Sequence, residues 1–337
     1  MTRFQLGRRI GLLRRLFSKP DDTNLHGNPE PAEVAKDFHC ICGAVLEPLV
    51  QHGETTHREV NGIITDIHHC KQCDHVQFAP LPSPEWLTDF YKSSEFWDVV
   101  GLDPNLYIEQ WVTHSPQLKF LDLVQKAADT LADDPITLHD FACGYGGMVK
   151  ALRDKGMDAA GSDLSTSTIE FGQSLGLPVS IGGIPDLLSL EPVDIITAYH
   201  AAEHFLDPNA FLSAAEKSLK PGGFLVLAFP NGAYAPARID CFNRYDWCFF
   251  PGHIHYYTPR SIEAALQRHG LELISLESNS DSETGAQKTW LINTMTEGQA
   301  DADLDQAALL ASMDSNLQSR DLRVVGRKPF GVASERR

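Results

Sequence analysis

Long apolar runs are absent from the 337-residue chain, since none of its hydrophobic stretches reaches the ~18 residues needed to span a membrane. The first 19 residues also lack the features of a secretory signal, because arginines interrupt every apolar stretch and no small-residue cleavage site follows. Both absences argue against a membrane-spanning or secreted protein. We therefore expect a cytoplasmic one.

Positive charge is also scarce. Lys and Arg total 28 against 45 Asp and Glu, which gives a net charge of −17. The first 19 residues hold six of the cations and no acid, so the remaining chain carries about −23. An acidic surface repels phosphate backbones. This charge argues against DNA or RNA as a partner and leaves small-molecule, sugar or protein substrates open.

The basic segment over residues 1–19 has two interpretations. Its apolar residues at one helical face are Leu6, Ile10, Leu13 and Phe17. An amphipathic helix of this kind could make weak contact with an anionic membrane surface, at the inner face of the membrane. Alternatively it is a solvated arm, because Arg9 and Arg14 crowd the apolar stripe. Together with a linker rich in Asp, Asn and Pro, it makes up residues 1–36.

Cysteine is rare as well, but four of the seven cysteines fall within 34 residues. They are Cys40, Cys42, Cys70 and Cys73. Two close pairs of thiols are typical of a four-thiolate zinc site, and a metal would stabilise a module too small to bury much apolar surface. The sequence therefore predicts a zinc-binding module over residues 37–80.

The first cysteine pair departs from the usual spacing. Only Ile41 separates its two thiols, whereas two residues separate those of the second pair. We therefore expect the first pair to lack the usual knuckle turn. One of its thiols could be replaced as a ligand by His39, His57 or His69. Alternatively, all four cysteines are buried reduced thiols without a metal.

The rest of the chain has the pattern of an α/β domain. Residues 81–134 are expected to form a helical connector, and over residues 135–337 apolar strands alternate with helical patterns. The predicted strands are 136–141, 158–162, 179–181, 194–199, 224–229, 271–278 and 322–327, and the predicted helices are 147–155, 165–176 and 209–219. This alternation predicts a largely parallel, doubly wound, Rossmann-like sheet with a polar insertion at residues 280–319.

A glycine-rich turn, Asp140-Phe141-Ala142-Cys143-Gly144-Tyr145-Gly146-Gly147, follows the first of these strands. Glycine lets the backbone approach a ligand too closely for a Cβ atom. Asp163 ends the next strand, where a carboxylate can accept hydrogen bonds from both hydroxyls of a ribose. The pattern indicates a nucleoside site. A tight turn without a ligand is an alternative, and the absence of Gly-x-Gly-x-x-Gly argues against a dinucleotide.

Four sequence blocks together resemble the class I S-adenosylmethionine-dependent methyltransferases, over residues 135–280. The blocks are Asp140–Gly147, Asp163, Asp194–Pro208 with its Glu203-His204 pair, and Leu219–Phe224 with its Lys-Pro-Gly-Gly turn. The resemblance implies a Rossmann-like methyltransferase sheet and S-adenosylmethionine as cofactor, with Asp140 anchoring the loop. Ala142 stands where the family usually has glycine, and alanine disfavours a positive φ angle.

The resemblance also implies roles for individual residues. Gly144 and Gly146 would pass beneath the methionine part of the cofactor. Asp163 would hold the ribose, Ile184 would lie near the adenine, and His200 would lie close to the sulfonium. These residues, with Asp140, form the predicted cofactor site.

The chain from Cys70 to Pro82 resembles the zinc-ribbon modules that precede some methyltransferase domains, notably those of sugar C-methyltransferases. In those enzymes a histidine in a loop resembling Gly252–Thr258 acts as the base. The resemblance makes His253 the predicted base and leaves His204 to position the acceptor, although Gly252 stands where that group has glutamate. Histidine titrates near neutral pH, as a base must. Alternatively, both histidines only pin the loop by hydrogen bonds.

The predicted function is methyl transfer to a small-molecule acceptor, with a sugar or glycoconjugate intermediate favoured. Aromatic and polar residues between Tyr234 and Phe250 would form the acceptor pocket or a lid packed on the cysteine module. Two other functions stay open. One is O- or N-methylation of another metabolite such as a quinone precursor, and the other is a catalytically silent module that binds the cofactor.

Overall fold

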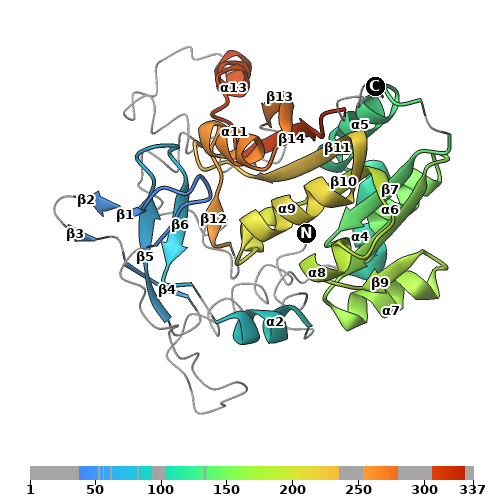
Figure 1. The fold of residues 1–337 in the computed structure, drawn as a ribbon, viewed down its shortest axis with the longest axis horizontal. Coiled ribbons are helices and arrows are strands. Elements are labelled where there is room, and N and C mark those ends of the chain that lie inside the picture. The colour runs from blue at the N-terminus through green and yellow to red at the C-terminus, as the bar shows by residue number, and fades with distance from the viewer. Residues whose placement is uncertain are drawn as a thin grey trace, which may run out of the picture.

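The computed structural model shows a small β-sheet module packed against a larger α/β domain (Figure 1). The described residues are 38–51, 54–55, 57–60, 63–81, 83–92, 97, 103–132, 134–234, 253–279 and 306–330. The basic segment over residues 1–19, the linker and most of the aromatic loop before His253 lie outside them. Within this part of the chain, no helix is both long and apolar enough to cross a membrane.

The α/β domain is built on a seven-stranded sheet in the order β13-β14-β11-β10-β7-β8-β9. Its strands are β7 (Thr137–Phe141), β8 (Asp158–Asp163), β9 (Val179–Ile181), β10 (Val193–Tyr199), β11 (Leu219–Pro230), β13 (Glu272–Asn279) and β14 (Asp321–Arg327). Five adjacent strands, β11, β10, β7, β8 and β9, run parallel to one another. β14 runs antiparallel to both its neighbours, β11 and β13. The predicted Rossmann-like, mostly parallel sheet is confirmed, and its strand order reverses between β7 and β10.

Helices cover both faces of this sheet because successive strand residues point into two separate cores. In β11, Leu225 and Leu227 belong to one core, while Val226 and Ala228 belong to the other. The first core is covered by α8 (Ile184–Leu187), α9 (Pro208–Ser218) and α11 (Pro259–Arg268), and the second by α4 (Pro104–Thr113), α5 (Ser115–Ala128), α6 (Gly147–Arg153) and α7 (Thr166–Ser174). Burial on both faces explains the continuous apolar run over residues 224–229 in β11.

The predicted strands and helices of this domain are confirmed, most of them to within two residues. The exception is β11, which begins at Leu219 instead of Phe224. Pro221-Gly222-Gly223 is typical of a turn, but here these residues continue the ladder. The N–H of Gly222 donates to the carbonyl of Lys328, and the N–H of Lys328 donates to the carbonyl of Gly223.

The small module has its own sheet, in the order β1-β5-β6-β12 with β4 paired to β5. Its strands are β1 (Glu47–Pro48), β4 (His57–Val60), β5 (Ile63–His69), β6 (Val76–Ala79) and β12 (His255–Tyr256), while β2 (Val50–Gln51) pairs with β3 (Glu54–Thr55). Figure 1 shows β12, in orange, beside the blue β6. Because β12 follows β11 in the chain, the α/β domain completes the sheet of the module.

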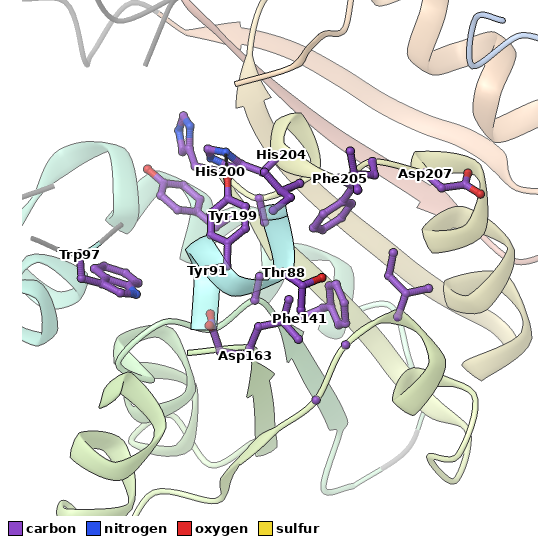
Figure 2. Close-up of a pocket in the computed structure, with 18 of the residues that line it drawn as sticks. Thr88, Tyr91, Trp97, Phe141, Asp163, Tyr199, His200, His204, Phe205 and Asp207 are labelled. Atoms are coloured by element: carbon purple, nitrogen blue, oxygen red, sulfur yellow. Dashed lines mark hydrogen bonds between the residues drawn. The ribbon is translucent and has the colours of Figure 1, made fainter. Parts of the chain in front are cut away.

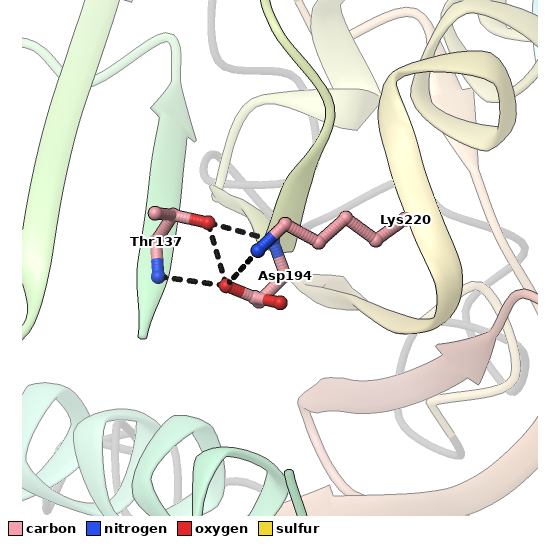
Figure 3. Close-up of polar contacts among 3 residues, drawn as sticks. All are labelled: Thr137, Asp194 and Lys220. Carbon is pink, nitrogen blue, oxygen red and sulfur yellow. Dashed lines mark hydrogen bonds and ion pairs between the residues drawn. The ribbon is translucent and has the colours of Figure 1, made fainter. Parts of the chain in front are cut away.

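A buried carboxylate joins the starts of three strands (Figure 3). The side chain of Asp194, at the start of β10, is 4% exposed. Its Oδ2 accepts hydrogen bonds from the backbone N–H and the hydroxyl of Thr137 on β7, at 2.9 and 2.6 Å, and from Nζ of Lys220 on β11, at 2.8 Å. These donors offset the desolvation of an acid that would otherwise be costly to bury.

Replacing Asp194 with asparagine should destabilise the fold without preventing it. The amide keeps the shape but loses the negative charge, and hydrogen bonds to a charged group contribute about 1.5–3 kcal/mol. We expect the free energy of unfolding in urea to fall by about 2 kcal/mol. Asp154→Asn is the control, because Asp154 forms an exposed ion pair with Lys150 and should change that energy by less than ~0.5 kcal/mol. Equal losses in both variants would contradict the role of Asp194.

Candidate active site

A cavity of about 660 Å³ opens at the carboxyl ends of β7, β8 and β10 (Figure 2). In open α/β sheets, ligands bind at this edge, where the strand order reverses. Phe141 and Ala142 line the cavity from the end of β7, Asp163 from β8, and Tyr199 and His200 from β10. The volume lies within the ~300–1,000 Å³ typical of sites for small molecules.

Asp163 holds the glycine-rich loop in place. The backbone N–H of Gly144 donates to its Oδ2 and the N–H of Ser165 donates to its Oδ1, both at 2.9 Å. Burial raises the pKa of Asp163, and the backbone hydrogen bonds oppose part of the rise. A carboxylate oxygen has more than one acceptor position, so Asp163 can hold the loop and still accept a hydrogen bond from a ligand hydroxyl.

Three residues of this loop adopt the left-handed backbone conformation. Ala142 has a φ of 59°, Gly144 a φ of 55° and Gly146 a φ of 80°. Because this conformation costs an alanine roughly 1–2 kcal/mol, the departure from glycine at Ala142 leaves strain in the loop instead of changing its path. A Cβ atom at Gly144 would come within 2.9 Å of the Trp97 ring and 3.1 Å of the Tyr107 hydroxyl. That position therefore requires glycine.

Of the residues predicted to bind the cofactor, Asp140, Gly144 and Gly146 are not among the described residues that line the cavity. Asp140 is buried at the end of β7 and accepts a hydrogen bond from the hydroxyl of Thr197 at 2.9 Å, which links β7 to β10. Burial raises the pKa of Asp140. Gly146 has a φ of 80° at the start of α6 and faces Leu177 and Val179. Their contact with a cofactor stays a prediction.

Ile184 and His200, also predicted to bind the cofactor, both lie in the cavity wall. His200 has a φ of 50°, a strained conformation that tends to cluster at functional sites. Its Nδ1 lies 3.3 Å from Oε1 of Glu203. Burial lowers the pKa of His200, but the hydrogen bond to Glu203 and the charges of Asp321 and Glu203 outweigh burial and raise the pKa above its ordinary value.

The two histidines predicted to act in catalysis pack against each other, with ring centroids 4.7 Å apart in an edge-to-face arrangement. His204 lines the cavity, and its Nδ1 is hydrogen-bonded to the hydroxyl of Tyr91 at 2.7 Å. His253 is not among the described residues of the cavity wall, and its Nε2 lies 3.8 Å from Oε1 of Glu203. One Glu203 oxygen and one ring nitrogen from each histidine lie within 4.8 Å of one another.

Sequence reasoning missed part of the cavity wall. The helix α2 (Pro84–Lys92), predicted as part of the connector, contributes Leu87 and Tyr91, and Figure 2 shows Tyr91 beside His204. Arg320 and Asp321, at the start of β14, complete the wall from the other side. The apolar spacing of α2 predicts a helix, but it does not say which distant element that helix contacts.

The four clustered cysteines come together in the structure. Their sulfur atoms lie within 4.8 Å of one another, with 3.4 Å between Cys40 and Cys73 and 3.6 Å between Cys42 and Cys70. The hydrogen bond from Cys40 lowers the pKa of Cys73 to about 6, while the same bond and burial raise the pKa of Cys40. The four sulfur atoms alone can therefore supply a set of four ligands, so none of His39, His57 and His69 is needed in place of a cysteine.

Each cysteine pair is followed by a left-handed turn residue, Gly43 with a φ of 90° and Asp74 with a φ of 65°. The N–H of Gly43 donates to the carbonyl of Cys40, and the N–H of Asp74 donates to the carbonyl of Cys70. The first pair therefore has a turn of its own, one residue shorter than the turn of the second pair, and Gly43 closes it.

Residues 253–258 connect the cysteine module to the cavity edge. The carbonyl of Ile254 accepts a hydrogen bond from the N–H of Phe78 on β6, and the N–H of Ile254 donates to the carbonyl of Glu203. The hydroxyl of Thr258 donates to the carbonyl of Cys73 at 3.0 Å. Thr258 is also the N-cap of α11, as its position before the helix predicts.

Residues 112–276 match a family model described as a methyltransferase domain. The match begins in α4 and ends in β13, so it includes the glycine-rich loop, Asp163 and the turn with Glu203. The match agrees with the predicted methyltransferase domain over these residues. The match does not extend to the cysteine module.

Two curated relatives are both named ubiquinone biosynthesis O-methyltransferase. The one from Brucella anthropi is 30% identical over 155 residues, which are 42% of this chain and span only 62% of that protein. The one from Xylella fastidiosa is 28% identical over 180 residues, which are 48% of this chain and 73% of that protein. A solved S-adenosylmethionine-dependent methyltransferase from Mesorhizobium loti superposes with a TM-score of 0.42 at 19% identity, over 60% of this chain and 96% of that one.

Asp163→Ala should weaken the binding of S-adenosylmethionine while leaving the domain folded. Losing hydrogen bonds from ribose hydroxyls to a charged acceptor costs about 1.5–3 kcal/mol, which is roughly a 10- to 100-fold increase in Kd by calorimetry. Asp158→Ala is the matched control, because Asp158 lies on the same strand but pairs with Arg153 at the surface. Identical affinities for Asp163→Ala and the parent would refute the assignment.

Proposed function

We propose that this chain transfers a methyl group from S-adenosylmethionine to a small-molecule acceptor. The observation that carries the proposal is the position of Asp163. Inside a matched methyltransferase domain, a carboxylate fixed by two backbone N–H groups borders a cavity at the point where the strand order reverses.

The residues around the cavity suit S-adenosylmethionine. Its ribose hydroxyls need an acceptor such as the carboxylate of Asp163. Gly144 of the glycine-rich loop lies against Trp97 and Tyr107, and both of these aromatic side chains line the cavity. Leu164 and Ile184 line the same cavity beside two glycines and offer an apolar surface to a flat base.

S-adenosylmethionine, when bound, supplies a methyl group made electrophilic by a positively charged sulfur. The protein has to align the attacking atom and take its proton. For a hydroxyl acceptor, a histidine ring nitrogen accepts the O–H proton as the oxygen bonds to the methyl carbon, and the electron pair of the broken carbon–sulfur bond stays on sulfur. We assign the base to His253 and the positioning of the acceptor to His204, supported by their contact with each other and with Glu203.

Two classes of acceptor have separate support. The described cavity wall is largely apolar and aromatic, with Tyr91, Trp97, Phe141 and Phe205 among its residues, which suits an aromatic ring. The names of the two curated relatives point to the same class, a quinone precursor. The resemblance of the cysteine module to the zinc-ribbon modules of sugar C-methyltransferases favours a sugar instead. We therefore propose a phenolic acceptor, with a sugar as the second candidate.

Transfer of a labelled methyl group to defined probes tests the proposal. The full-length chain is incubated with methyl-labelled S-adenosylmethionine and either catechol or UDP-glucose, and we expect label in catechol. Label in UDP-glucose alone would favour the sugar class. Saturable binding of S-adenosylmethionine without transfer to any phenol or sugar would instead support the silent binding module.

The same assay tests the base. With the acceptor that is methylated, His253→Ala should lower kcat by ~10²–10⁴-fold and leave the affinity for S-adenosylmethionine nearly unchanged. His269→Ala is the control, because His269 is hydrogen-bonded to Asn209 away from the cavity wall. Turnover of His253→Ala within a few-fold of the parent would rule it out as the base.

We also propose that the cysteine module holds a zinc ion. Tetrahedral zinc with Zn–S bonds of ~2.3 Å places its sulfur ligands about 3.8 Å apart. The two closest pairs, at 3.4 and 3.6 Å, are near this spacing. A thiolate is the form that binds zinc, and Cys73 with its pKa of about 6 supplies one near neutral pH.

Elemental analysis of protein purified without added metal should find one zinc per chain, held by Cys40, Cys42, Cys70 and Cys73. Cys73→Ser should lose the metal. Cys143→Ser should keep it, because Cys143 is buried in the core beneath α6. A folded, metal-free parent with four titratable thiols in the module would exclude the zinc site.

A further inference from the structure

Glu203 is an acid with a fully buried side chain between His200, which lines the cavity, and His253, which is not among the described residues of the cavity wall. It lies in η1 (Ala202–His204), the short turn after β10. Its Oε1 lies 3.3 Å from Nδ1 of His200 and 3.8 Å from Nε2 of His253. A single carboxylate oxygen thus faces imidazoles from two elements that are distant in the sequence.

A buried carboxylate destabilises a protein unless nearby charge or hydrogen bonds compensate for lost hydration. At Glu203 the compensating groups are imidazoles, at distances longer than a strong charge-assisted hydrogen bond. An amide of the same shape would carry a smaller desolvation penalty. The acid at position 203 therefore differs from the amide by its negative charge, which acts on the rings of His200 and His253.

The backbone fixes Glu203 opposite His253. The carbonyl of Glu203 accepts a hydrogen bond from the N–H of Ile254 at 2.9 Å, one residue after His253. The hydroxyl of Tyr257 donates to the carbonyl of Ala202, also at 2.9 Å. Contacts on both sides therefore hold the backbone of this turn beside the segment that carries His253.

We infer that Glu203 is a positioning residue of the transfer site, whose carboxylate orients His253 for proton transfer and holds His200 at the cavity wall. The inference rests on the proposed function, since it assigns these histidines to methyl transfer. Tyr91, on α2, positions the third histidine of the cluster in the same way, because its hydroxyl is hydrogen-bonded to Nδ1 of His204 (Figure 2).

Three charged groups act on His200, namely Glu203 from η1 and both Arg320 and Asp321 from the start of β14. Burial and Arg320 lower the pKa of His200, whereas Glu203 and Asp321 raise it. Removing the charge of Glu203 leaves only Asp321 to oppose burial and Arg320. The pKa of His200 should therefore fall in Glu203→Gln, and the neutral imidazole should gain population near neutral pH.

Glu203→Gln in the full-length chain tests the inference by NMR and by kinetics. The ring ¹⁵N signals of His200, assigned with His200→Gln, should titrate at a lower pH in Glu203→Gln than in the parent. kcat should fall at least ~10-fold while the Kd of S-adenosylmethionine changes less than ~2-fold. Glu203→Asp, which restores the charge, should recover part of both losses.

Glu216→Gln is the matched control, because Glu216 pairs with Lys328 at 3.3 Å on α9, and neither residue lines the cavity. It should leave the His200 titration and kcat unchanged. An unchanged His200 titration in Glu203→Gln overturns the inference, even if activity is lost.

Two further outcomes separate this inference from its alternatives. A parent protein whose activity requires Mg²⁺, and whose binding of Mg²⁺ is lost in Glu203→Gln, overturns it, because the carboxylate would then be a ligand of a cation. A parent that binds S-adenosylmethionine but methylates no acceptor refutes the proposed function. The titration shift of His200 would still support the contact that Glu203 makes.

Discussion

Hydrogen bonds of residues 253–258 reach both the cysteine module and the cavity edge. Toward the cysteine module, β12 pairs with β6, and the hydroxyl of Thr258 donates to the carbonyl of Cys73. Toward the cavity, Ile254 donates to Glu203, in the turn that carries the histidine cluster. The module and the cavity edge therefore share one short segment, which is hydrogen-bonded to both.

The large sheet could be predicted from the sequence because its signals are local. Short strands rich in apolar residues alternate with helices that have glycine, serine or aspartate at their starts, so the alternation is visible in the sequence. The start of β11 could not be predicted, because Gly222 and Gly223 have the composition of a turn and pair only when Lys328 is beside them. Long-range pairing outweighed the local preference.

The sequence predicts only those residues of the candidate site that belong to a recognisable motif. Asp163, Ile184, His200 and His204 all line the cavity. Arg320 and the residues of α2 reach the same cavity from segments with no motif, and tertiary contacts alone place them there. Glu203 is visible in the sequence as part of a motif, but its burial and its contacts with histidines on either side appear only once the chain is folded.

The position of β12 in the chain has a consequence for the order of folding. In the sheet of the cysteine module β6 pairs with β12, and the ring of His75, just before β6, is hydrogen-bonded to the ring of His255 on β12, 180 positions away. During synthesis the module emerges first, but its sheet cannot be complete until most of the α/β domain has been translated. The N-terminal module is therefore among the last parts of the molecule to reach its final structure, and contacts of such long sequence separation slow folding.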